Sequence, residues 1–254
     1  MLEFIVLSLV QGLTECLPVS SSGHLFLLSR WIGYDLSLAT AVGLHLATLL
    51  AVILYLRKEC RQILAGMLQF DKAYWRLFWG FLLASVPAAL VGFLVKDSLE
   101  TAFANPTAIG INLLITGGFL FLSDFIKRDQ TPSMSLTQIT WRQAFAIGLF
   151  QSVAVLPGIS RSGLTLVGCL VVGLPRELAF RYTFLLSIPV ILGSGLLELR
   201  SFSVSSELVP GYVIAFFIAL LALFLFRKPV LRSRLRYFAY YCWILGALLL
   251  LILR

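Results

Sequence analysis

Two short polar segments interrupt an otherwise apolar chain, and both consist of side chains that can bind or transfer a phosphate group. Residues 11–24 read QGLTECLPVSSSGH, and residues 157–165 read PGISRSGLT. Aligning their Ser-x-Ser-Gly patterns matches residues 20–23 with residues 160–163. The chain therefore carries one polar motif twice, once in each half. Buried charged residues in an apolar chain indicate function, because they are costly to keep there.

The first segment contains a candidate site for a divalent cation. Gln11 and Glu15 are four residues apart, so they share one face of a helix. Carboxylate and amide oxygens are ligands for Mg²⁺ or Ca²⁺. We therefore interpret Glu15 and Gln11 as metal-binding residues. The alternative is a structural Glu15 that caps a helix or pairs with Arg161.

Both Ser/Gly clusters are expected to begin a half-helix in the middle of an apolar segment. Free N–H groups and the positive end of the helix dipole favour an anion there. Glycine lets the backbone approach such a ligand closely. The candidate substrate-binding residues are Ser20, Ser22, Gly23, Ser160, Ser162, Gly163 and Thr165.

Three further side chains are candidates for the chemistry itself. Ser21 and His24 lie one helical turn apart, so His24 could serve as base for a Ser21 nucleophile, or as acid toward a leaving group. Arg161 stays charged and presents a fork of donors that matches phosphate oxygens. The alternative for Ser21 and His24 is a helix cap with a packing histidine. The alternative for Arg161 is a structural ion pair.

The composition predicts an all-α, polytopic membrane protein. The 254 residues are 59% hydrophobic and 13% charged, with a mean hydropathy of +0.95. We expect six transmembrane helices at about 38–56, 76–95, 107–126, 178–198, 210–226 and 237–253. Regions 1–33 and 143–175 are apolar but broken by the polar segments, which favours two re-entrant helical hairpins. The four scattered cysteines indicate neither a disulfide framework nor a metal site.

The net charge of +8 does not indicate nucleic-acid binding, because the basic residues lie beside hydrophobic spans. Fifteen of the 20 Lys and Arg residues fall in four segments on one side, 57–76, 127–142, 176–181 and 227–236. That side is expected to be cytoplasmic, with both termini external. The two hairpins then enter from opposite faces. This predicts an inverted-topology repeat within one membrane domain, with halves 1–128 and 139–254 and a site near the midplane.

The two motifs together resemble those of the bacterial undecaprenyl-diphosphate phosphatase family associated with bacitracin resistance. That family's first motif ends in PVSS-S/T-GH, as do residues 18–24, and its second is PGxSRSxxT, as in residues 157–165. Order, spacing, length and hydropathy agree over the whole chain. The resemblance implies two interlocked inverted halves with two re-entrant hairpins.

The resemblance also implies an activity and roles for individual residues. The substrate would be a polyprenyl diphosphate, hydrolysed to the monophosphate carrier and inorganic phosphate in the bacterial cytoplasmic membrane. Glu15 would be the metal or catalytic carboxylate, Ser21 the nucleophile, His24 the acid/base and Arg161 the diphosphate ligand, supported by Thr165. The family also has a version with two carboxylates, whereas Gln11 supplies no charge here. The metal, Mg²⁺ or Ca²⁺, and its affinity therefore stay open, as does the oligomeric state.

Two other functions fit parts of the pattern. A flippase or transporter for the same lipid or another anion would also have inverted repeats and broken helices. An intramembrane serine protease could use Ser21 and His24, but it would not explain Arg161 and its flanking serines. His45 has no acidic neighbour in sequence, so we interpret it as a packing residue, although it could line the cavity.

Overall fold

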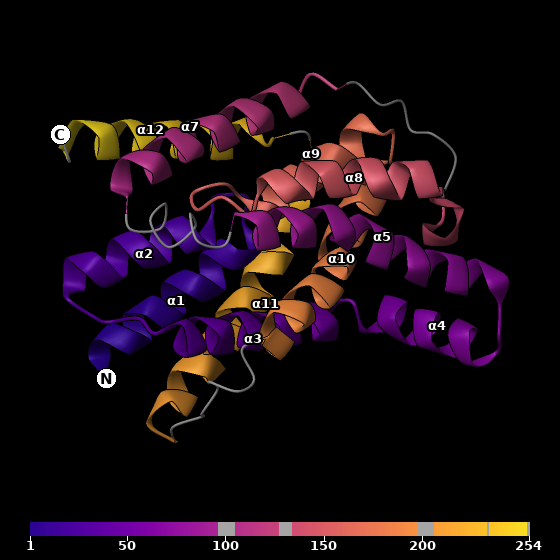
Figure 1. The fold of residues 1–254 in the computed structure, drawn as a ribbon, viewed down its shortest axis with the longest axis horizontal. Coiled ribbons are helices and arrows are strands. Elements are labelled where there is room, and N and C mark those ends of the chain that lie inside the picture. Colours follow the sequence, from indigo (N-terminus) through magenta and orange to yellow (C-terminus); the bar gives the residue numbers. More distant parts are fainter. Residues whose placement is uncertain (96–104, 127–133, 198–205, 233, 253–254) are drawn as a thin grey trace.

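The computed structural model describes residues 1–254 except 96–104, 127–133, 198–205, 233 and 253–254 (Figure 1). Within the described ranges the regular structure is helical and contains no strand, as the composition predicts. The helices are α1 (Leu2–Cys16), α2 (Ser21–Ile32), α3 (Leu38–Tyr55), α4 (Arg57–Leu68), α5 (Lys72–Leu94), α7 (Pro106–Ser123), α8 (Trp141–Val153), α9 (Arg161–Val171), α10 (Arg176–Leu197), α11 (Val209–Leu231) and α12 (Arg236–Ile252). Two 3₁₀ turns, Leu136–Gln138 and Ser206–Leu208, precede α8 and α11.

Four of these helices, α5, α7, α10 and α11, are long and apolar enough to cross a membrane. A fifth span results if α3 and α4 count together, although they are bent by 80° at their junction. Helix α12, the sixth expected span, has 17 residues and is apolar but shorter. Multiple apolar helices of this kind are typical of a multi-pass membrane protein. Positions 198 and 253, where two expected spans end, lie outside the described residues.

The two apolar regions with polar interruptions each form a pair of helices. In the first, α1 ends at Cys16 and the chain runs through Pro18 to Ser20, which caps α2. In the second, α8 ends at Val153 and the next helix begins only after the cap at Ser160. The partners of each pair contact each other. The prediction that each Ser/Gly cluster begins a helix is confirmed, and the two helices begin at residues 21 and 161.

The helix pairs pack against distant parts of the chain. Helix α1 lies against α11, and α8 lies against α5. Helices α7 and α12 lie side by side along one edge of the molecule (Figure 1). Each pair of broken helices is therefore held by an element from the other half of the sequence. The apolar core between them includes Ala84, Ile147 and Leu223, all of which are fully buried or nearly so.

The breaks in the two helix pairs touch each other at the centre of the fold. The Ser162 hydroxyl donates to the Leu17 carbonyl over 3.1 Å. A side chain at Gly163 would meet the Pro18 ring at 3.1 Å, so glycine allows this close approach. Gly158 has a φ of +90°, and a Cβ there would lie 2.7 Å from the Ile109 carbonyl. The contacts of Ser162 and Gly163 bring the starts of α2 and α9 together, and Gly158 packs the second break against α7.

Candidate active site

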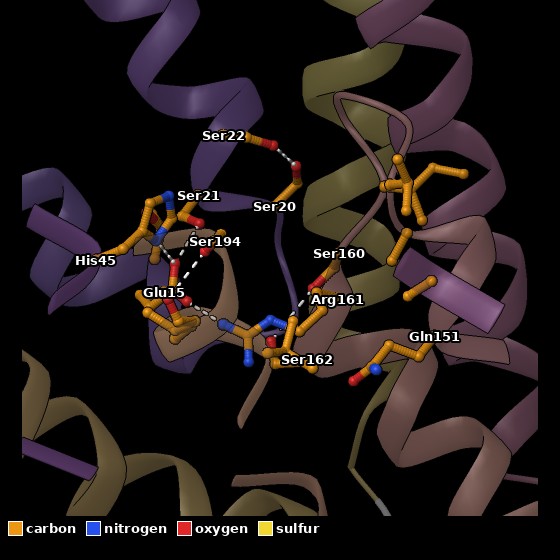
Figure 2. Close-up of a pocket in the computed structure, with 17 residues that line it drawn as sticks. Glu15, Ser20, Ser21, Ser22, His45, Gln151, Ser160, Arg161, Ser162 and Ser194 are labelled. Carbon is orange, nitrogen blue, oxygen red and sulfur yellow. Dashed lines mark hydrogen bonds and ion pairs between the residues drawn. The ribbon is translucent and has the colours of Figure 1, made fainter. Parts of the chain in front are cut away.

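The two polar segments line one pocket of about 320 Å³. From the first segment come Thr14, Glu15, Ser20, Ser21 and Ser22, and from the second come Ser160, Arg161 and Ser162. His45, Gln151 and Ser194 complete its polar lining, and Figure 2 shows these side chains around the opening. The structure therefore brings the two predicted motifs together around one pocket.

Helices α2 and α9 begin at this pocket with the same local structure. The Ser20 hydroxyl accepts from the Gly23 N–H at 3.3 Å, and the Ser160 hydroxyl accepts from the Gly163 N–H at 3.1 Å. The remaining N–H groups of a first helical turn have no partner within the helix. Two helix starts directed at one pocket give it a positive electrostatic potential suited to a polyanion.

Ser20 has an unusual backbone that is held in place by His24. Its φ of 68° and ψ of 90° are rare for a residue with a side chain and cost about 1–3 kcal/mol. The Nδ1 atom of His24 lies 2.8 Å from the Ser20 carbonyl oxygen, and its Nε2 lies 2.6 Å from the Tyr241 hydroxyl. The His24 and Tyr241 rings also stack. His24 thus fixes the turn that aims the start of α2 at the pocket.

Among the described residues that line the pocket, Glu15 is the sole carboxylate, and it is almost fully buried. One of its oxygens, Oε1, pairs with the Arg161 guanidinium. The other, Oε2, accepts from the Ser21 hydroxyl at 2.6 Å and from the Gln11 amide at 3.1 Å. His45 Nδ1 lies 3.1 Å from the same oxygen. Buried charges need such partners, so the ion pair considered in the sequence analysis is confirmed.

Ser21 is paired with Glu15 and not with His24. We expected His24 to take the proton of Ser21 because the two residues are one turn apart, but His24 faces Ser20 and Tyr241 and does not line the pocket. The group placed to accept the Ser21 proton is the Glu15 carboxylate. This hydrogen bond gives the hydroxyl a neighbour that can accept its proton, which is the arrangement of a Ser–base pair.

His45 is not only a packing residue, and the alternative kept in the sequence analysis, that it could line the cavity, is confirmed. It comes from α3, lines the pocket and contacts both Glu15 and Gln11, at 3.1 and 3.0 Å respectively. No pattern near His45 in the sequence could reveal this, because its acidic partner lies on α1 and the two helices meet only in the fold.

Other predicted site residues are buried next to the pocket and do not line it. Thr165 is fully buried, and its hydroxyl donates to Gln151 Oε1 at 3.4 Å. The Gln151 amide in turn donates to the Ala84 carbonyl. Neither Thr165 nor Gly23 or Gly163 lines the pocket. These residues shape the helix starts, and Gln151 itself reaches the lining.

Comparison with known proteins decides the family. The model of the family described as bacitracin resistance protein BacA matches residues 4–248, which include both polar segments. The chain belongs to the BacA family. The match extends over every residue of the pocket.

Relatives of this family are similar along nearly their whole length. The chain is 41% identical over 238 residues to a protein from Thermosipho melanesiensis, with 94% of each chain covered. It is 42% identical over 243 residues to one from Methanococcus vannielii, with 96% of each covered. It is 39% identical over 260 residues to one from Carboxydothermus hydrogenoformans, covering 98% of this chain and 96% of the relative. All three relatives are named undecaprenyl-diphosphatase.

The donor set of this BacA-family pocket fits a divalent cation only in company with an anionic ligand. Within the described ranges no group of three or more His, Cys, Asp and Glu side chains could hold a metal. Glu15 offers one carboxylate, whose oxygens already face Arg161 and Ser21. Gln11 does not line the pocket, although its amide contacts Glu15 and its Oε1 atom is buried without a hydrogen-bond partner, which leaves one further oxygen beside the carboxylate. Mg²⁺ sites with one or two carboxylates take their other oxygens from phosphates and water.

Proposed function

We propose that this chain hydrolyses undecaprenyl diphosphate, or a polyprenyl diphosphate of similar length. The products are the lipid monophosphate and inorganic phosphate. The observation that carries this proposal is the convergence of Ser21, Glu15 and Arg161 in one pocket between two helix starts. The names of relatives about 40% identical over nearly the full length support the same activity. The reaction would return the lipid carrier to cell-wall synthesis.

The first step is attack by the Ser21 hydroxyl on the terminal phosphorus. Its oxygen forms a bond to phosphorus while the bond to the bridging anhydride oxygen breaks, and the lipid monophosphate leaves. The proton of Ser21 passes to Glu15 Oε2, which already accepts its hydrogen bond at 2.6 Å. Water then attacks the phosphoserine, the bond between phosphorus and the serine oxygen breaks, and Ser21 regains a proton as phosphate is released.

Arg161 connects substrate binding with this proton transfer. In the free protein its guanidinium neutralises Glu15. Compared with the Glu15 carboxylate, a diphosphate offers more oxygens and more negative charge in the geometry that a guanidinium prefers. Movement of Arg161 onto the substrate would leave Glu15 free to accept the Ser21 proton. The same guanidinium stabilises the charge that develops on the phosphoryl oxygens.

Glu15, which lines the pocket, and Gln11, whose amide contacts Glu15, are the residues that would hold a divalent cation, Mg²⁺ or Ca²⁺. Such an ion supplies charge neutralisation for the transferring group. His45 is a positioning residue, since it contacts both Glu15 and Gln11. Ser20, Ser22, Ser160 and Ser162 contribute hydroxyl and N–H donors to the phosphate oxygens.

The membrane arrangement extends this proposal. We infer six transmembrane helices and two re-entrant hairpins, α1–α2 and α8–α9, in an inverted repeat of residues 1–128 and 139–254. Packing of α1 on α11 and of α8 on α5 supports it, because the two contacts are equivalent under exchange of the halves. Both termini would be external in a bacterial cytoplasmic membrane, with the site open to the outside. The start of α1 and the end of α12 lie at the same end of Figure 1, and α4 lies at the other.

Phosphate release in detergent tests the activity. Purified protein should release inorganic phosphate from polyprenyl diphosphate with no membrane separating two compartments. A transporter of the same lipid would release none. Movement of labelled polyprenyl phosphate across vesicles, without phosphate release, would replace the proposal with the transporter alternative.

A further inference from the structure

A second polar hollow lies outside the active site, where four helix ends meet. Its walls come from the junction of α3 and α4, the start of α10 and the end of α11. It consists of two adjoining cavities of about 280 and 330 Å³, which share Tyr55, Phe224 and Arg227. No residue of this hollow lines the pocket around Glu15.

The hollow is strongly basic. Its lining contains six cations, Arg57, Lys58, Arg181, Arg227, Lys228 and Arg232, and two carboxylates, Glu59 and Glu177. The carboxylates are already neutralised. Arg181 pairs with Glu59 at 3.2 Å and with Glu177 at 2.9 Å, and Arg227 pairs with Glu177 at 3.0 Å.

Four cations remain around the hollow without a carboxylate. Within the described part of the chain, Arg57, Lys58, Lys228 and Arg232 form no ion pair. All four are exposed. Like charges gathered around one concavity repel one another, so an anion that enters it is favoured.

An apolar track leads from this hollow along α11. Phe217, Leu221 and Phe224 follow at spacings of four and three residues, so they lie on one face of the helix. Their side chains are 61, 54 and 61% exposed, and α11 is one of the helices that are long and apolar enough to cross a membrane. Phe224 belongs to both the track and the wall of the hollow. The arrangement matches a molecule with an anionic head and an apolar tail.

We propose that this hollow binds the headgroup of an anionic glycerophospholipid, whose acyl chain lies along Phe217, Leu221 and Phe224. The excess of cations selects a net negative headgroup over a zwitterionic one, as basic pockets between transmembrane helices do. The bound lipid connects α4 with α10 and α11, which belong to the other half of the sequence, and therefore stabilises the folded chain by mass action. This site is independent of the proposed phosphatase activity.

Native mass spectrometry of the purified protein, titrated with phosphatidylglycerol or phosphatidylcholine, tests the proposal. The wild type should bind phosphatidylglycerol more tightly. The double variant Lys228→Gln/Arg232→Gln should lose about tenfold or more of that affinity. The matched control, Arg61→Gln/Lys72→Gln, removes two exposed cations that do not line the hollow and should bind as the wild type does.

Three results would overturn the proposal. The first is equal affinity of the wild type for the two lipids, and the second is equal phosphatidylglycerol binding by the double variant and the control. The third is displacement of the bound lipid by a lower concentration of polyprenyl monophosphate, which would make the hollow a product site. If the double variant does not fold, the variant Arg57→Gln/Lys58→Gln removes two cations from another part of the lining and should show the same loss of phosphatidylglycerol affinity.

Discussion

Glu15 and Arg161 form an ion pair that joins the two polar motifs of the chain. Glu15 lies near the end of α1 and Arg161 begins α9, so the pair exists only because the two broken helix pairs meet. Its carboxylate also holds the Ser21 hydroxyl. One acidic side chain therefore connects the proposed nucleophile with the proposed phosphate ligand, and substrate binding can act on both.

Replacing Arg161 by lysine should remove most of the activity although the charge remains. An ammonium group cannot reproduce the fork that fits both a carboxylate and a phosphate. Loss of one strong donor in the transition state costs about 3 kcal/mol, or about a hundredfold in rate. Phosphate release measures this, with Arg142→Lys on the exposed start of α8 as control. Turnover near that of the wild type would rule out the role of Arg161 as phosphate clamp.

Glu15→Gln should be far more damaging than Gln11→Ala. Glu15 is the carboxylate of the pocket, whereas Gln11 lends at most a neutral oxygen. A chelator should abolish phosphate release, and Mg²⁺ or Ca²⁺ should restore it. The variant Gln11→Glu adds a second carboxylate and should bind the ion more tightly, which a titration with Mn²⁺ followed by electron paramagnetic resonance can measure. Full activity in excess chelator would exclude the metal role.

His45→Leu should lower kcat about tenfold with little change in KM. A tenfold loss is the lower end of the cost of removing a residue that orients a functional side chain. The reason is that His45 contacts Glu15 and Gln11 from the α3 side. His45→Gln can still donate to the carboxylate and should retain most of the activity. Steady-state kinetics of the two variants distinguish a positioning role of His45 from a packing role. If His45 only filled space, the two variants would have similar kcat values.

The sequence was informative where the chemistry is local and less so where it depends on tertiary contacts. The caps at Ser20 and Ser160 follow from nearby residues, and both helix starts were predicted correctly. The partner of His45 could not be predicted, because α1 and α3 meet only in the fold. His24 has the right spacing for Ser21, but the hydrogen bonds to Ser20 and Tyr241 turn it away.

Hydropathy likewise located apolar helices but not their geometry. The expected span at 38–56 agrees with α3, yet nothing in its apolar run predicts the 80° bend at Leu56 that leads into α4. The bend matters because it forms one wall of the basic hollow. Helix α5 begins at Lys72, four residues before the predicted position, since the cap at Asp71 sets its start.

Cysteine labelling in intact cells tests the proposed topology. On a background without the native cysteines, an impermeant reagent should label Asp35→Cys between α2 and α3. It should not label Gln69→Cys or Ser135→Cys, because their loops carry the basic residues expected in the cytoplasm. All three positions are exposed on the protein surface. Labelling of position 69 or 135 would contradict the inverted repeat, since the two hairpins would then enter from the same face.

Attack by Ser21 on the terminal phosphate is the step on which the whole site depends, and trapping the phosphorylated protein tests it most directly. Protein mixed with polyprenyl diphosphate that is labelled in its terminal phosphate is quenched in acid, digested and analysed by mass spectrometry. We predict labelled phosphate on Ser21 in the wild type, none in the variant Ser21→Ala, and labelling still on Ser21, at a reduced rate, in Ser22→Ala. Substantial phosphate release by Ser21→Ala, without any phosphorylated peptide from the wild type, would contradict the mechanism and favour direct attack by water.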